Sequence, residues 1–230
     1  MTAQIDRRAR LSPKPGDRNR VLGLNQVLGD DPNVRDSANI LTPLVATNGV
    51  VFPYTPTINE VTSVSYNSYD LQGTNSGYAS FNKRDTKKLT IAGNFTCMNQ
   101  TEARYSLASL YFFRASTMSY FGVNDFNGVF TQAVQNRGAP PPLLNFNAWG
   151  TAMFNNVSVL IENFSADWTN DVDWVEVLNI PGLPNETCWL PSKFLISATL
   201  IVQNSPERWR RAFNLDAFRS GKLISRGGWV

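Results

Sequence analysis

Histidine is absent from this 230-residue sequence. Its absence excludes Ser-His-Asp and Cys-His nucleophile pairs, HExxH zinc sites and imidazole acid–base catalysis. Catalysis by carboxylates alone stays open, but nothing in the spacing of the acidic residues favours it. We therefore expect no enzymatic activity, no cofactor and no bound metal.

Cysteine is scarce, with only Cys97 and Cys188, which lie far apart and outside any metal-ligand spacing. No run of 18 apolar residues is present, so no transmembrane helix is expected. The first residues lack an apolar signal core, so nothing there marks the chain for export. We expect both thiols to be reduced and packed, and a long-range disulfide is the alternative.

Phosphate-binding glycine loops are also missing, both the Walker type and Gly-x-Gly-x-x-Gly. The densest carboxylate cluster is Asp167, Asp171 and Asp173. It lacks the central glycine and the bidentate glutamate of a calcium loop. A turn between strands is therefore the favoured interpretation, and an enzyme that uses these carboxylates is the alternative.

Charge is segregated along the chain, whose formal net charge is +3. Residues 1–20 carry six Arg or Lys against two Asp, and residues 206–230 carry six against one Glu and one Asp. Each end is therefore +4 and the middle is −5. Basic ends on an acidic body suggest tails that contact acidic protein or nucleic acid, or flexible tails that only aid solubility. The aromatic residues of the C-terminal tail favour a partner surface there.

Three segments follow from composition. Residues 1–48 are interpreted as an extended basic N-terminal arm with at most a short helix or strand near Arg20–Leu28. Residues 49–205 form a β domain, and residues 206–230 form a basic aromatic C-terminal tail. A long arm with little core of its own is usually disordered or laid across a neighbour.

Strict alternation of apolar and polar residues over Lys87–Met98 predicts a half-buried strand. Phe194–Gln203 alternates with both faces partly apolar, which is typical of a strand in a sheet interior. Residues 71–84 are predicted to form a polar loop or a long hairpin. Shorter strands are expected near residues 50–58, 61–69, 117–121, 143–146 and 157–168.

One helix is predicted, over Thr101–Arg114. Asn99 and Glu102 have the spacing of a capping box at its start. Its apolar residues lie nearly all round, which indicates burial on more than one side. The fold class is therefore mainly β, with one main helix at about 101–114.

An ordered series of short segments along residues 50–221 carries a family resemblance. The segments are Phe52-Pro-Tyr-Thr-Pro, Tyr111-Phe-Phe-Arg-Ala-Ser-Thr-Met, Pro140-Pro-Pro-Leu-Leu-Asn-Phe, Met153-Phe-Asn-Asn-Val, Asn170-Asp-Val-Asp-Trp, Pro191-Ser-Lys-Phe and Phe213-Asn-Leu-Asp-Ala-Phe-Arg-Ser-Gly. In this order they resemble the baseplate tail-tube initiator proteins of contractile-tailed bacteriophages.

The resemblance implies a tail-tube fold, in which two packed antiparallel sheets and one helix form the subunit. Six such subunits form a ring, and their long strands close into a shared inner barrel. Such initiators join the central hub to the tail tube, start tube growth and line the DNA channel without reading its sequence. Expected partners are therefore other copies, the hub, the tail tube or a second initiator, and sheath initiator or wedge proteins. The expected location is the virion, assembled in the host cytoplasm, with no membrane anchor and no catalytic residue.

Two alternatives stay open: the major tail-tube or secretion-tube subunit, and a β-sandwich module that binds carbohydrate or nucleic acid. Under the ring hypothesis the acidic body would repel the phosphates of passing DNA. Subunit or partner contacts are expected at Phe52, Tyr54, Tyr105, Phe112, Phe113, Trp209, Arg210, Arg211, Phe213, Phe218 and Trp229.

Overall fold

A computed structural model describes residues 7–22, 39–70, 72–119, 138–150, 152–180 and 186–224. Its strands are β1 (Arg10–Pro13), β2 (Val50–Val51), β3 (Thr57–Val61), β4 (Val64–Tyr69), β5 (Tyr78–Arg84), β6 (Lys88–Thr96), β7 (Leu144–Ala148), β8 (Phe154–Trp168), β9 (Trp174–Val177), β10 (Cys188–Pro191) and β11 (Lys193–Val202). Its helices are α1 (Arg18–Leu22), the 3-10 turn η1 (Thr42–Leu44), α3 (Gln100–Ser116), α4 (Pro206–Ala212) and α5 (Leu215–Arg219).

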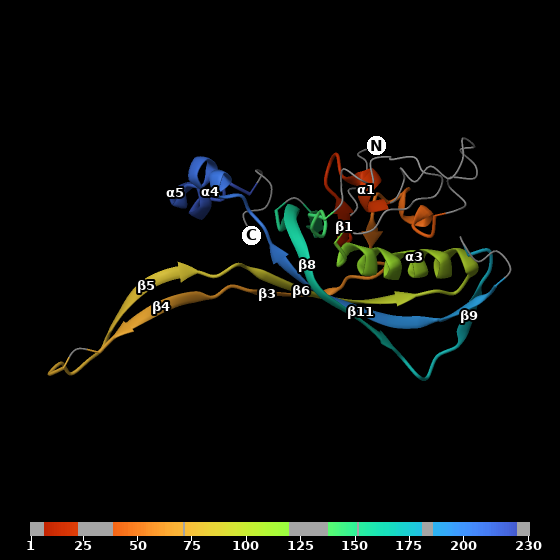
Figure 1. Ribbon diagram of the computed structural model, residues 1–230, viewed down its shortest axis with the longest axis horizontal. Coiled ribbons are helices and arrows are strands. Elements are labelled where there is room, and N and C mark those ends of the chain that lie inside the picture. Colours follow the sequence, from red (N-terminus) through yellow and green to blue (C-terminus); the bar gives the residue numbers. More distant parts are fainter. Residues whose placement is uncertain are drawn as a thin grey trace.

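Seven strands form one antiparallel sheet in the order β2-β1-β7-β8-β11-β6-β3. The long strand β8 belongs to both halves of it, since its start pairs with β7 and the rest pairs with β11. The two halves lie on opposite sides of α3 (Figure 1). This arrangement confirms the mainly β fold with one main helix. The two predicted layers are parts of one continuous sheet, and the described strands do not close into a barrel.

The two long central strands, β6 and β11, were both predicted from alternation. In both strands every second side chain is buried. Leu89, Ile91 and Phe95 on β6 are fully buried, and so is Phe194 of β11, which lies opposite Phe95. Gly93 continues this buried row without a side chain. A Cβ there would lie 2.5 Å from Cδ1 of Phe52, so glycine is what lets the Phe52 ring rest on the sheet.

Helix α3 confirms the predicted helix and its cap. The Asn99 Oδ1 accepts from the Glu102 N–H at 2.9 Å, and the Glu102 carboxylate accepts from the Met98 N–H at 2.9 Å. The helix contacts β6, β8 and β9 as well as η1 and α1. It is therefore buried on two sides, as its all-round apolar pattern predicted.

The described part of the N-terminal segment differs from the extended arm that composition suggested. β1 pairs with both β2 and β7 inside the large sheet. Leu11, Leu22 and Leu44 are fully buried in the same core as α3. Sparse leucines in a polar segment sufficed to anchor it, so residue 48 is not a boundary between arm and body. Residues 23–38 lie outside the described part of the chain.

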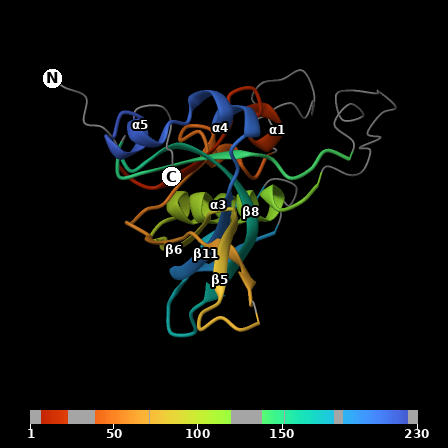
Figure 2. The ribbon, with the colours of Figure 1, turned by 90° about the vertical axis from the view of Figure 1, so that its left-hand side faces the viewer.

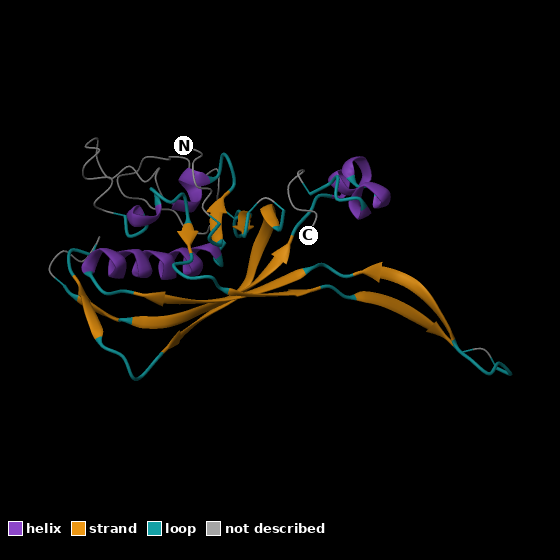
Figure 3. Ribbon diagram, turned by 180° about the vertical axis from the view of Figure 1, so that it is seen from behind, coloured by secondary structure: helices purple, strands orange, loops and turns teal. Residues whose placement is uncertain are grey.

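The other predictions are mostly met. The described residues of the segment expected to be a polar loop or a hairpin, 72–84, belong to a long hairpin. β4 and β5 pair with each other and continue β3 and β6 away from the body (Figure 1). The strand expected over residues 117–121 is not formed by its described residues, because Thr117 is the C-cap of α3. The C-terminal tail contains two short helices, α4 and α5, which composition did not predict (Figure 3).

Candidate assembly surfaces

One face of the half-sheet β8-β11-β6-β3 is bare. Its opposite face packs against α3, and no described element lies beneath it (Figures 1 and 2). Strand alternation assigns to the bare face Thr57, Asn59, Val61, Lys88, Thr90, Ala92, Asn94, Thr96, Asn163, Ser165, Asp167, Lys193, Leu195, Ser197, Thr199 and Ile201.

The bare face is made mainly of small hydrogen-bonding side chains. Ser165 and Ser197 share a hydrogen bond of 2.8 Å across it. Lys88 forms an ion pair of 2.7 Å with Glu162. The other charged residues of the face are Lys193 and Asp167. Positive and negative charges therefore balance on this face. Repulsion of DNA phosphates would require the acidity of the body to be concentrated here, and it is not.

The same half-sheet has two free edges. On one side, no described strand pairs with β8 beyond Val159, which leaves the backbone of residues 160–168 open. On the other side, β6 is the one strand within the described residues that pairs with β3. Unpaired strand edges bind other strands readily, and proteins normally cover or shorten them. A nine-residue open edge is therefore a candidate contact surface.

The ladder shows which backbone groups point out from these edges. The Cys97 N–H donates to the Ser192 carbonyl at 2.9 Å, one step beyond the last pair of β6 and β11. Hydrogen-bonded and non-hydrogen-bonded pairs alternate along an antiparallel ladder. Given the register of β8 on β11, the backbone groups of Ala166 and Trp168 face the free edge of β8. Those of Glu60 face the free edge of β3.

The two edges also run in opposite directions. β8, β11, β6 and β3 are successively antiparallel, so the fourth strand opposes the first. A second copy placed beside the first would bring its β8 edge antiparallel to the β3 edge. The half-sheet can thus repeat side by side without changing its pairing type.

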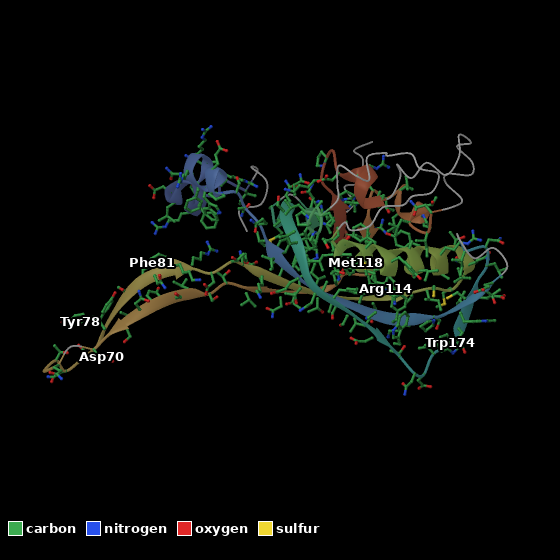
Figure 4. All side chains as sticks on the ribbon, in the orientation of Figure 1. Asp70, Tyr78, Phe81, Arg114, Met118 and Trp174 are labelled. Carbon is green, nitrogen blue, oxygen red and sulfur yellow. The ribbon has the colours of Figure 1, made fainter. Side chains whose placement is uncertain are left out.

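A second exposed feature is the β4–β5 arm, residues 64–84, which extends beyond the body (Figure 4). Nearly all its described side chains are exposed. Tyr66 is 61% and Phe81 64% exposed, and their rings meet edge to face at 6.2 Å. A two-stranded ribbon has no core of its own and is marginal alone, so these aromatic side chains favour contact with a neighbour.

The predicted contact residues divide into two groups. Phe52, Phe112 and Phe113 are fully buried within the subunit, so we assign them to core packing instead of an interface. The Tyr105 hydroxyl accepts from the Val51 N–H at 2.8 Å, which also ties it to the fold. Apolar residues on a helix do not reveal from sequence whether their own sheet or a neighbour covers them.

The second group remains available for contact. Tyr54 is 57% exposed, and its hydroxyl lies 3.1 Å from Oγ1 of Thr96 at the rim of the bare face. We call residues 206–224, which include α4 and α5, the C-terminal module. No residue of either helix is buried. The module contains the predicted contact residues Trp209, Arg210, Arg211, Phe213 and Phe218. Trp229 lies outside the described residues.

No chemistry-bearing centre emerges among the described residues. They contain no group of three or more Cys, Asp or Glu placed to hold a metal. Both cysteines are free, and Cys97 is buried. Burial, with a smaller contribution from the nearby Glu102 carboxylate, raises the pKa of the Cys97 thiol. This thiol is therefore held in its unreactive protonated form at neutral pH.

One cleft of about 430 Å³ lies on the outer side of β1 and β7 and is lined by Arg7, Arg8, Arg10 and Trp149 among others. Its cations and partly exposed indole fit the binding-module alternative better than an enzyme. Sequence patterning missed this cleft because it combines residues more than 130 positions apart.

No protein-family model matches the chain, and no curated protein matches it. Within the described residues, no helix has both the length and the apolarity to cross a membrane.

Proposed function

We propose that this chain is a structural subunit that assembles side by side into a closed ring. The supporting observation is the half-sheet β8-β11-β6-β3, which has a bare polar face and two free antiparallel edges. Repeated pairing of the β8 edge of one copy with the β3 edge of the next covers both edges of every half-sheet once the ring closes. The bare faces of all copies then line one channel.

The resemblance to tail-tube initiators supplies the biological setting of this proposal. The ring is hexameric and sits in a phage baseplate, where it joins the hub to the tail tube, starts tube polymerisation and lines the DNA channel. It is not an enzyme. A channel of Thr, Ser and Asn side chains with balanced charge gives passing DNA no row of cations to bind, and salt-dependent phosphate binding needs such cations.

The C-terminal module and the β4–β5 arm support a role with several neighbours. Both are exposed and lie toward the same end of the half-sheet (Figure 1). The proposed partners of the ring are the hub and the tail tube or a second initiator. The major tube subunit is the alternative function, which predicts many stacked rings in each particle instead of one or two.

The mass of the purified chain tests the ring. One subunit weighs 25.7 kDa, so six copies weigh about 154 kDa, six times that value. We expect light scattering during size-exclusion chromatography to find this species, and negative-stain images to show rings with a central hole. A strict monomer at all concentrations, both alone and with baseplate proteins added, would contradict the proposal.

A further inference from the structure

The cleft over β1 and β7 collects three arginines on one side of the sheet. Its volume of about 430 Å³ is in the range of sites that enclose one small ligand. Arg7, Arg8 and Arg10 line it, and so do three asparagines and the indole of Trp149. Among the described residues that line the cleft there is no Asp or Glu. The cleft is therefore cationic, and it attracts an anionic ligand.

The sheet holds Arg10 in the floor of the cleft. Arg10 lies opposite Asn147 of β7 in the ladder. Both side chains point outward, because their neighbours Leu11 and Phe146 are fully buried in the core. The Asn147 Oδ1 accepts from the Asn156 N–H at 2.7 Å. This bond fixes the amide and leaves its NH₂ group as a donor to a ligand.

Two turns form the walls of the cleft. On the β7 side, the Trp149 N–H donates to the Arg7 carbonyl at 3.0 Å, which continues the ladder beyond the start of β1. The Trp149 ring packs on Phe154 with centroids 5.7 Å apart and stays 38% exposed. On the β2 side, a Cβ at Gly49 would clash with the Leu11 carbonyl oxygen, so glycine lets this turn pack on β1. The cleft is therefore preformed, and binding does not have to order its walls.

Arginines beside a partly exposed indole suit a nucleotide. A guanidinium binds phosphate oxygens through paired N–H donors. Arg8 and Arg10 also interact with other groups of the chain, but each guanidinium has five donors and can bind phosphate as well. The face of an aromatic ring stacks with any base, and asparagine amides pair with base edges. An acidic peptide would use the cations but has no base to offer the indole and the amides.

The position of the cleft favours a mononucleotide over DNA in the proposed channel. β1 lies on one side of α3, and β6 and β11 lie on the other (Figure 1). The cleft is on the outer side of β1 and β7, so the core separates it from the bare face that lines the proposed channel. A cleft of this volume also encloses one nucleotide and not a strand.

We infer that this cleft binds one mononucleotide in each subunit, with the phosphates on the arginines and the base stacked on Trp149. Asn147 donates to the ligand from the floor. The sequence has no glycine-rich phosphate loop, and arginine side chains take the place of its backbone donors here. The site goes beyond the proposed ring and does not depend on it, because all the residues named for it belong to one chain.

Calorimetric titration of ADP into the purified chain tests the site. We expect saturable binding of one ADP per subunit, with a dissociation constant below about 1 mM. Adenosine and pyrophosphate each contact only part of the cleft, so each should bind at least about tenfold more weakly than ADP. Tetraglutamate and a single-stranded oligonucleotide are the competing ligands, and both should bind more weakly than ADP.

Substitutions separate the phosphate contact from the stacking contact. Arg7→Gln with Arg8→Gln should weaken ADP binding at least about tenfold, because it removes charge-assisted hydrogen bonds. Trp149→Ala should weaken ADP binding about tenfold and leave pyrophosphate binding unchanged, and Trp149→Phe should restore most of the ADP affinity. The matched control, Lys83→Gln with Arg84→Gln on the exposed arm, removes the same number of charges and should have no effect. Circular dichroism checks that each variant is folded.

The site and the ring can fail separately, because nucleotide binding is measured per subunit. A chain that binds ADP but stays monomeric under all conditions would contradict the ring alone. A ring without saturable ADP binding would overturn the nucleotide site alone. Equal loss of ADP binding in the arm control, or binding of tetraglutamate or the oligonucleotide as tight as that of ADP, would also overturn the site, because a cleft that only attracts negative charge gives these results.

Discussion

Ala166→Pro leaves the subunit folded but prevents ring formation. The Ala166 N–H faces the free edge of β8, so proline removes no bond to β11, and edge positions of this kind tolerate proline. In the ring, the same change leaves an acceptor on the neighbouring β3 edge without its donor. An unsatisfied buried polar group costs about 1–3 kcal/mol, and the cost recurs at every interface of the ring.

The expected readout is a shift from ring to monomer in light scattering, with an unchanged circular dichroism spectrum. Ala166→Ser keeps the N–H and should assemble normally. On the opposite edge, Glu60→Pro should also prevent assembly, and Glu60→Gln controls for the lost ion pair with Lys87. Rings that form at wild-type concentrations with both prolines present would show that these edges are not the contact.

Phe113→Ala has the largest expected effect on the stability of the subunit itself. Phe113 is fully buried and contacts Phe52, Phe112 and Phe164 at centroid distances of 6.5, 6.0 and 5.8 Å. Truncating such a ring creates a cavity and costs about 3–5 kcal/mol. A domain has only about 5–15 kcal/mol in total. We expect a matching fall in the free energy of unfolding by urea.

Tyr111→Ala on the same helix is the matched control for this loss. Tyr111 is 40% exposed, and the guanidinium carbon of Arg114 lies 5.3 Å from the centroid of its ring. Its removal should cost less than about 1 kcal/mol, as exposed cation–π contacts do. If both variants lost stability equally, α3 would not be held by the aromatic core that the structure shows.

Local patterns predicted the strands and helix whose own residues carry a strong signal. β6 and β11 alternate strictly, and the Asn99–Glu102 pair marks the start of α3. The N-terminal segment carries no such signal, because β1 is only four residues long. What holds it is pairing with β7, which comes more than 130 residues later. Pairing over such distances leaves no local periodicity to detect.

The candidate surfaces were predictable only in part. The basic, aromatic character of residues 206–224 is visible in the sequence, and so is the polar face of β6. The free edges are not, because an edge is defined by the absence of a neighbouring strand. Phe112 and Phe113 show the converse limit: the sequence indicates that they are buried, but only the fold shows that their own sheet buries them.

Disulfide cross-linking between the two edges tests the proposed ring most directly. The bare-face residues of β8 and β3 make their backbone hydrogen bonds to β11 and β6 within the same copy. Across the contact between two copies they therefore meet as non-hydrogen-bonded pairs. The Cα atoms of such a pair are about 4.5 Å apart, which is within reach of a disulfide. Ser165→Cys is combined in turn with Thr57→Cys, Asn59→Cys or Val61→Cys in a Cys188→Ser background, oxidised and separated without reductant. The ring predicts, for one register, a ladder of cross-linked species that ends at six copies. A ladder that stops at dimers, or no cross-link in any of the three, would contradict it.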